Sequence, residues 1–317
     1  MSKELSLKEV GKLLMDADSL IICFHVGPDG DALGSSLGLA RYLIKQGKAV
    51  KVFVDDVIND HYKFMPGLDL VQRPVLGEVH EADLFVVLDL SSIDRVGIVK
   101  DCVKAKTLLN IDHHISNVKF ADYLYLDANA SSTGEILCEL FGEMGWEMDE
   151  EIANLFYTAI VTDCGSFKYS CTSPKTMRMA ANLIERGVHP EEINEAIDTQ
   201  SRATMELLAK VLPSLAFAYE GRVAYLSIPN DLYDKNIHTD SFVNYPRYIE
   251  GVDVAFMVKA VEPNLTRVSL RSTKAVDVAQ IAFSLGGGGH MRAAGCSIKA
   301  PMDEAIKIIL EALGKVL

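Results

Sequence analysis

The sequence predicts an α/β protein with a parallel-sheet N-terminal domain and a smaller α/β C-terminal domain, joined by a helical linker. In the first two thirds of the chain, short apolar runs alternate with stretches of helical spacing, which is typical of a parallel sheet with helices on both faces. A second group of strand-like runs begins near Tyr219. The expected boundaries are residues 1–189 for the first domain, 190–218 for the linker and 219–317 for the second domain.

The expected N-terminal sheet comes from apolar runs of strand length, at Ser19–Phe24, Val50–Val54, Leu84–Leu88 and Leu108–Ile111. Stretches with helical spacing lie between and after them, at Gly34–Gln46, Glu135–Met144, Glu151–Val161, Pro174–Arg186 and Glu191–Thr199. The glycines Gly30, Gly34 and Gly38 are four residues apart and would let a helix pack closely on the sheet.

The C-terminal domain is expected to combine strands at Val223–Ile228, Val254–Val261 and Arg267–Leu270 with helices at Val276–Phe283 and Met302–Leu313. A run of four glycines, Gly286 to Gly289, separates the two helices. The segment from Pro190 to Ala218 has helical spacing and a polar face, which suits a connector between domains.

Composition limits the class of protein. The chain has 317 residues, of which 49% are hydrophobic and 24% charged, as in ordinary globular proteins. No apolar run is long enough for a membrane helix, and the first residues carry no apolar signal-peptide core. Six scattered cysteines without a C-x-x-C pair indicate reduced thiols, so we expect a cytoplasmic location. A homodimer is the expected assembly for a chain of this size.

The net charge of −13 narrows the partners. From Tyr219 onward, 11 basic and 11 acidic residues balance, so the first 218 residues carry the whole excess of negative charge. A protein that holds a long polyanion needs a basic track, which this chain lacks. We therefore expect no long nucleic acid as a partner. A nucleic-acid substrate should be short, or metal ions should supply the positive charge.

Acidic and histidine residues follow the predicted strands. Because the carboxyl ends of parallel strands meet at one edge of a sheet, we expect these side chains to lie together. A single Asp after a strand is often only a helix cap or a turn residue, and a lone histidine is usually a core residue. Their joint occurrence points to a site: His25, Asp29 and Asp31; Asp89; Asp112, His113 and His114; and Asp163.

These residue types suit a pair of divalent cations. Two such ions about 3.5–4 Å apart can clamp one phosphate and activate water. Four carboxylates offset the charge of the two ions, and two imidazoles complete their coordination without adding charge. Mixed histidine and carboxylate ligands favour Mn²⁺ over Mg²⁺, which prefers oxygen, while Zn²⁺, Co²⁺ and Fe²⁺ stay possible.

At these positions the chain resembles the DHH phosphoesterases. All four motifs of that family appear in order: His25 to Ala32; Asp89 with Arg95 and Gly97; Asp112-His113-His114 with Asn117; and Thr162-Asp163 leading to Gly165-Ser166-Phe167. The tail resembles the DHH-associated C-terminal domain through Ser269 to Ser272, the glycine run with His290, and Ala293-Ala294-Gly295. Size and motif spelling are most similar to the branch of nanoRNases, also called oligoribonucleases, and phosphatases of 3′-phosphoadenosine 5′-phosphate (pAp).

The resemblance implies a role for each matching residue. It implies six metal ligands: His25, Asp29, Asp31, Asp89, His113 and Asp163. Asp31 and Asp89 would be shared between the ions, and with His114 they form the expected catalytic set. His114 would contact the scissile phosphate, and Asp112 would orient a ligating imidazole. The C-terminal domain would hold substrate through Arg271, Ser272, Gly288, Gly289 and His290.

The function implied is metal-dependent hydrolysis of short oligoribonucleotides and linear dinucleotides such as pApA to nucleoside 5′-monophosphates, with pAp phosphatase activity as a second reaction. A chain whose main activity is pAp hydrolysis, or a phosphodiesterase of the cyclic di-AMP pathway, would carry the same metal site, so the motifs leave these alternatives open. A nucleotide sensor without turnover is the alternative outside catalysis. It would be expected to lack at least one ligand, whereas all six are present.

Overall fold

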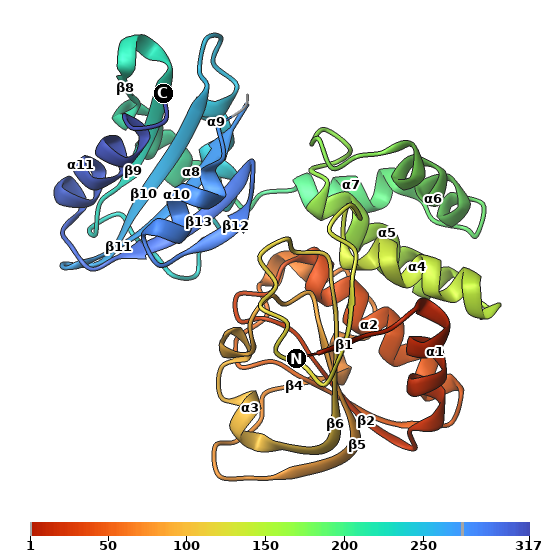
Figure 1. Ribbon diagram of the computed structural model, residues 1–317. Helices are drawn as coiled ribbons and strands as arrows, with labels where there is room; N and C mark the ends of the chain where they lie inside the picture. Colours follow the sequence, from red (N-terminus) through yellow and green to blue (C-terminus); the bar gives the residue numbers. More distant parts are fainter. Residues whose placement is uncertain (1, 274–275) are drawn as a thin grey trace. The chain divides into compact units, whose positions relative to one another are not determined.

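The computed structural model describes residues 2–273 and 276–317, apart from the side chain of His290 (Figure 1). The chain divides into two compact units, residues 1–199 and 200–317. This boundary falls within the range 190–218 that was expected to form a helical linker. Helix α7 (Pro190–Asp198) ends before the boundary, and helix α8 (Arg202–Val211) begins after it.

The first unit contains a sheet of seven strands in the order β1-β7-β6-β5-β2-β3-β4, and every neighbouring pair among the described residues is parallel. The expected α/β class with a parallel N-terminal sheet is confirmed. The strands are β1 (Lys3–Glu4), β2 (Ser19–Cys23), β3 (Ala49–Phe53), β4 (Val71–Gln72), β5 (His80–Leu88), β6 (Val103–Asp112) and β7 (Tyr123–Leu126). The helices are α1 (Leu7–Asp16), α2 (Gly30–Lys45), α3 (Val99–Cys102), α4 (Thr133–Met144), α5 (Glu150–Asp163), α6 (Pro174–Ile184) and α7.

Helix α2 starts four residues before the expected Gly34, because Asp29 caps it. The Asp29 side chain accepts hydrogen bonds from the backbone N–H groups of Asp31 and Ala32. Helix α1 and strand β7 were not expected from the sequence. Helix α1 opens with a capping box in which Ser6 and Glu9 satisfy each other's backbone N–H groups, a local signal that could have been found in the sequence.

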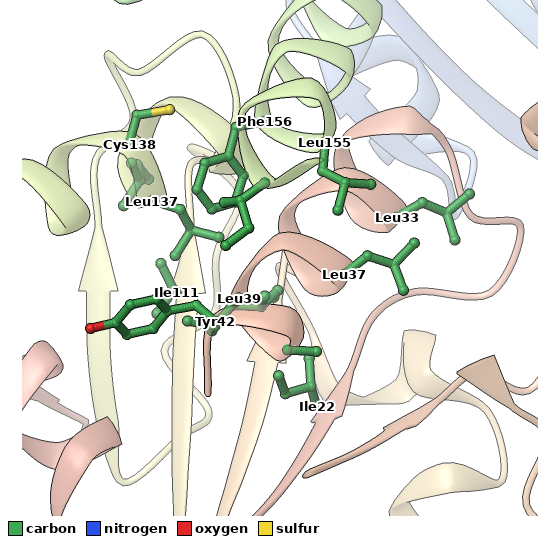
Figure 2. Close-up of a cluster of buried hydrophobic side chains, with 14 of the residues drawn as sticks. Ile22, Leu33, Leu37, Leu39, Tyr42, Ile111, Leu137, Cys138, Leu155 and Phe156 are labelled. Atoms are coloured by element: carbon green, nitrogen blue, oxygen red, sulfur yellow. The ribbon is translucent and has the colours of Figure 1, made fainter. Parts of the chain in front are cut away.

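The two faces of the sheet are covered differently. Along β2, Leu20 and Ile22 belong to a large apolar core, which also takes in side chains of α1, α2, α4 and α5. Figure 2 shows Ile22 of this core together with side chains of α2, α4 and α5. Ile21 and Cys23 belong to a smaller cluster on the other face, with residues of α3 and of the 3-10 turn Ile93–Val96. Helices on both faces were expected. On the second face, the described residues form the one-turn helix α3, the 3-10 turn Ile93–Val96 and loops instead.

The glycines of α2 face another helix rather than the sheet, which corrects the expectation. A Cβ atom on Gly30, Gly34 or Gly38 would collide with residues of α5, namely Thr162, Leu155 and Phe156. The two helices therefore approach closely, as the labelled side chains of Leu33, Leu37, Leu155 and Phe156 show (Figure 2). This contact brings the start of α2 beside the end of α5, where Asp31 and Asp163 lie.

The second unit contains a six-stranded mixed sheet in the order β12-β13-β11-β10-β9-β8. Its strands are β8 (Ala216–Ala218), β9 (Val223–Ile228), β10 (Val254–Glu262), β11 (Leu265–Ser272), β12 (Gly288–His290) and β13 (Ala293–Ile298). Helices α10 (Val278–Ser284) and α11 (Met302–Leu313) share one apolar core with the sheet, and α8 and the segment around α9 (Asn244–Arg247) share another. Part of the expected glycine run forms strand β12. Among the described residues, no helix has the length and apolar character that a bilayer crossing needs.

Candidate metal centre

The carboxyl edge of the first sheet gathers the acidic and histidine residues named above. His25 lies two residues after the end of β2. Asp89 directly follows β5, and His113 directly follows β6. Asp31 lies in the first turn of α2, and Asp163 is the last residue of α5. Their ligand atoms form three groups of three within 4.8 Å of one another: His25, Asp29 and Asp89; Asp31, His113 and Asp163; and Asp89, His113 and His114.

The first group surrounds the imidazole of His25. The Nδ1 of this buried ring lies 3.0 Å from the carbonyl oxygen of Val26, and Nε2 points to two carboxylates. Nε2 lies 3.4 Å from Asp89 Oδ2 and 3.7 Å from Asp29 Oδ2. The other oxygen of Asp29 is the cap of α2. Asp29 is thus a helix cap and a candidate ligand at once, because each role uses a different oxygen.

The second group surrounds the imidazole of His113. Its Nδ1 lies 3.3 Å from the carbonyl oxygen of Ala130, so Nε2 again points to the carboxylates. Nε2 lies 3.4 Å from Asp163 Oδ2, 3.4 Å from Asp89 Oδ1 and 3.7 Å from Asp31 Oδ2. A backbone carbonyl that accepts from Nδ1 fixes the tautomer in which Nε2 offers a lone pair to a metal.

Asp89 connects the two groups. Its Oδ2 lies near His25 and its Oδ1 near His113, and the side chain is almost fully buried. Its backbone has φ +56°, in the left-handed region that non-glycine residues rarely adopt. Its N–H still donates to the carbonyl of Ile111, a bond that continues the pairing of β5 with β6. Strain of this kind persists where the surrounding structure holds the residue, often at a functional site.

Burial of several carboxylates in one place perturbs their protonation. Burial, reinforced by the charge of Asp89, raises the pKa of Asp31 well above its usual value. Burial also raises the pKa of Asp163 to about 6, although His113 opposes that shift. Burial likewise disfavours the ionised form of Asp89, but hydrogen bonds with His113 and His25 outweigh it and hold the pKa of Asp89 low.

The buried carboxylates also change the protonation of the histidines. Burial disfavours protonation of His113, but its contacts with Asp89 and Asp163 outweigh burial and raise its pKa well above the usual value. In this arrangement protons on the imidazoles compensate the buried carboxylate charge. Divalent cations would do so better, since both Nε2 atoms and the carboxylate oxygens that face them have the chemistry of metal ligands. The residues present therefore fit a metal centre.

Asp112 contacts a different histidine from the one expected. Its Oδ1 lies 2.7 Å from Nδ1 of His114, whereas His113 faces the Ala130 carbonyl. The resemblance implied that Asp112 orients a ligating imidazole. The structure shows instead that it holds His114. Asn117 donates to the other oxygen of Asp112 at 2.6 Å and completes its fixation.

The start of α4 contributes contacts that the sequence analysis missed. Thr133 and Gly134 donate their backbone N–H groups to the two oxygens of Asp31, at 2.7 and 2.9 Å. The hydroxyl of Thr133 donates to Asp89 Oδ1 at 3.2 Å, and Ser35 also donates to Asp31. The available signal was Ser-Ser-Thr-Gly-Glu at residues 131–135, where a serine stands three residues before a glutamate, as is typical of a helix start. That these polar residues are buried is seen only in the structure.

The C-terminal residues that were predicted to hold substrate lie on β11 and β12 of the second sheet, and β13 runs between these two strands. Arg271 pairs with Ala293 of β13, which pairs on its other side with His290 of β12. Gly289 has φ +137°, and a Cβ atom there would lie 2.5 Å from the carbonyl oxygen of Ala293, so glycine is required. The register thus places the backbone of His290 level with Arg271 two strands away, with Gly288 and Gly289 beside it on β12, while the His290 side chain lies outside the described part.

Ser272 differs from the others. It is fully buried, and its hydroxyl lies 3.5 Å from the carbonyl oxygen of Met291. Neighbours along a strand point to opposite faces of a sheet, so Ser272 and Arg271 cannot present their side chains to the same side. The side chain of Ser272 is therefore part of the interior of the second unit.

The fold and the site together define a metal-dependent phosphoester hydrolase. Residues 19–160 match the N-terminal domain of the DHH family, and residues 220–317 match the DHHA1 domain. The chain belongs to the DHH family.

Curated relatives and a solved structure agree with this assignment. The chain is 33% identical to the bifunctional oligoribonuclease and PAP phosphatase NrnA of Thermus thermophilus, over 93% of this chain and 89% of that protein. It is 30% identical to the protein of the same name from Bacillus subtilis, over 93% of each chain. An exopolyphosphatase-related protein from Bacteroides fragilis has a similar structure, with a TM-score of 0.86, 27% identity, and coverage of 98% of this chain and 95% of that one.

Proposed function

We propose that this chain hydrolyses short oligoribonucleotides and linear dinucleotides such as pApA to nucleoside 5′-monophosphates, and removes the 3′-phosphate of pAp as a second activity. The names of the two curated relatives support this substrate class. The single observation that carries the chemistry is the position of Asp89, whose two oxygens face two separate groups of candidate metal ligands.

The proposed ligands are His25, Asp29, Asp31, Asp89, His113 and Asp163. We propose Mn²⁺ as the ion, because each group combines an imidazole nitrogen with carboxylate oxygens and Mg²⁺ favours oxygen alone. The chemistry that a bound pair of such ions supplies is polarisation of the phosphoryl oxygens and a lowered pKa of water.

His114 is proposed to protonate the leaving oxygen. Its Nδ1–H donates to Asp112 Oδ1, so Nε2 is the atom that can carry the transferred proton. Asp112 stays ionised, because the hydrogen bond with His114 outweighs the effect of burial and lowers the pKa of Asp112. The carboxylate therefore holds the ring in one orientation.

The proposed substrate is short for two reasons. The first 218 residues carry the whole net charge of −13, which disfavours a long polyanion. The second unit offers Arg271 and the Gly288–His290 strand as a place for one phosphate, since arginine binds phosphate through two parallel hydrogen bonds and glycine lets backbone N–H groups come close. In this proposal residues 219–317 act as the substrate-holding domain.

Two further expectations accompany the proposal. All six cysteines are free thiols, five of them buried, which supports a reducing compartment such as the cytoplasm. The expected homodimer rests on chain length alone and stays a prediction.

The test is a product assay on the purified chain with Mn²⁺ and with EDTA. The substrates are pApA, a five-nucleotide RNA, cyclic di-AMP and pAp, and Asp89→Ala is the inactive control. Release of monophosphate from pApA and from the short RNA supports the proposal, and the rate with pAp ranks the second activity. Turnover of pAp alone would make the protein a phosphatase. Binding of Mn²⁺ and nucleotide without turnover would favour a sensor.

A further inference from the structure

Thr133 touches both of the central carboxylates. Its backbone N–H donates to Asp31 Oδ2 at 2.7 Å, and its hydroxyl donates to Asp89 Oδ1 at 3.2 Å. The residue has no exposed surface. One side chain on α4 thus connects a carboxylate at the start of α2 with a carboxylate that follows β5.

The hydroxyl of Thr133 is not used to cap its own helix. That task falls to Ser132, whose side chain accepts the N–H of Glu135 at 3.0 Å. Thr133 is the first residue of the helix, where the N–H group has no partner within the helix and the helix dipole favours a negative charge. Here the N–H groups of Thr133 and Gly134 take one carboxylate between them.

Tight packing sets the position of this helix start. A Cβ atom on Gly134 would lie 2.5 Å from the Cβ of Ala159 on α5, so α4 and α5 approach as closely as two backbones with small residues can. Thr133 is β-branched, which restricts its side chain to few rotamers. The position of the hydroxyl therefore follows from the position of the helix.

A buried glutamate holds the same helix start from the other side. Glu135 Oε2 accepts hydrogen bonds from the hydroxyls of Ser131 and Thr176 at 2.6 and 2.7 Å. Lys175 Nζ lies 3.5 Å from Oε1 and balances the charge. Thr176 lies in the first turn of α6, so Glu135 ties α4 to α6.

We infer that Thr133 is a positioning residue that sets Asp31 and Asp89 in the geometry required to hold two cations. The inference rests on the proposed metal site. Asp89 Oδ1 also lies 3.4 and 3.6 Å from ring nitrogens of His113 and His114. The Thr133 hydroxyl adds a third contact to this oxygen, so the orientation of the Asp89 carboxylate depends on Thr133 as well as on the histidines.

The experiment compares Thr133→Val with Thr133→Ser in the full-length chain. Valine keeps the shape and the backbone bond to Asp31 but lacks the hydroxyl, and serine keeps the hydroxyl. The matched control is Thr158→Val, because Thr158 is also buried and on a helix of the same unit, and among the described residues its hydroxyl donates to the Asn154 carbonyl of its own helix rather than to a carboxylate. The readouts are calorimetric titration of metal-free protein with Mn²⁺, and the electron paramagnetic resonance signature of a coupled Mn²⁺ pair.

Thr133→Val is expected to weaken Mn²⁺ binding by about 10–100-fold, the usual effect of removing a group that orients a ligand. It should also reduce the signal of the coupled pair. Thr133→Ser should restore binding, and Thr158→Val should bind as the wild type does. Thr133→Ala, which removes the same hydroxyl with a smaller side chain, decides the matter if the valine variant does not fold.

Wild-type Mn²⁺ affinity in Thr133→Val or Thr133→Ala would overturn the inference, and so would a serine variant as weak as the valine variant. Failure of the proposed function would give a different result in the same titration. In that case the wild-type chain itself would bind fewer than two Mn²⁺ ions.

Discussion

Asp112 Oδ1 lies 2.7 Å from Nδ1 of His114, and both side chains are buried. Asn117 binds the second oxygen of Asp112, so the carboxylate has one orientation. The contact orients the ring of His114, the residue proposed to protonate the leaving oxygen. The function of Asp112 therefore depends on its position two residues before the histidine that it orients.

Replacing Asp112 by Asn should impair proton transfer by His114. The amide offers one accepting oxygen where the carboxylate offers two, one to the His114 ring and one to Asn117, so the ring loses its fixed orientation. The kcat with pApA should therefore fall by about 100-fold, within the range that general acids contribute. The loss should shrink with a p-nitrophenyl nucleotide ester, whose leaving group needs no proton. The control is Asp127→Asn, since Asp127 follows the neighbouring strand β7 and caps a turn at Asn129. Equal losses with both substrates would contradict the role of general acid.

Binding of Mn²⁺ should release protons near pH 6. The pKa of Asp163 is raised to about 6, so between pH 4 and 6 the metal-free folded chain binds more protons than the unfolded chain does. The contribution of Asp163 to the free energy of unfolding therefore falls as pH rises through this range, and Mn²⁺ affinity rises. Calorimetric titration at pH 6 in two buffers of different ionisation enthalpy measures the protons released, and Asp163→Asn should release fewer. Identical heats in both buffers would count against this assignment.

Arg271→Ala should raise KM for pApA more than it changes kcat. A hydrogen bond to a charged group contributes about 1.5–3 kcal/mol, so KM is expected to increase about tenfold or more. Arg267→Ala is the control, because Arg267 lies four residues earlier on β11 and is exposed. Steady-state kinetics over a range of pApA concentrations separates the two constants. An unchanged KM in Arg271→Ala would remove Arg271 from the substrate site.

Gly34→Ala should destabilise the first unit by about 1–3 kcal/mol, as overpacking of a core does. The added Cβ atom would collide with the backbone of Leu155 on α5, and backbone cannot move aside cheaply. Gly142→Ala on α4 is the control, since nothing lies within 4 Å of its Cβ position and alanine favours a helix by about 0.5–1 kcal/mol. Thermal unfolding of the metal-free variants measures both effects. Equal stability of Gly34→Ala and the wild type would show that the two helices can separate.

The gathering of the candidate ligand residues at one edge of the sheet was predictable, because most of them follow a predicted strand. Asp89 and His113 follow buried strands, and a parallel sheet brings such positions to one edge whatever the loops do. The elements were also predictable where the local signal is strong, as in Val223–Ile228 and Met302–Leu313, whose bounds agree with β9 and α11. Strand β7 was missed, since four residues with two tyrosines give little periodicity.

Contacts between distant segments were not predictable in this way. The sequence alone does not show that Gly34 meets Leu155 rather than the sheet, or that Asp112 holds His114 rather than His113. Thr133 lies 102 residues from Asp31 in the chain, and its role depends on where α4 is placed.

The sequence by itself determined which side chains reach the edge of the sheet, because strand length and direction follow from local pattern. It also determined the charge balance that disfavours a long polyanion. Only the tertiary structure decided how those side chains are oriented. Orientation depends on hydrogen bonds from helices packed against the sheet, and their positions follow from close packing of the whole unit rather than from any short stretch of residues.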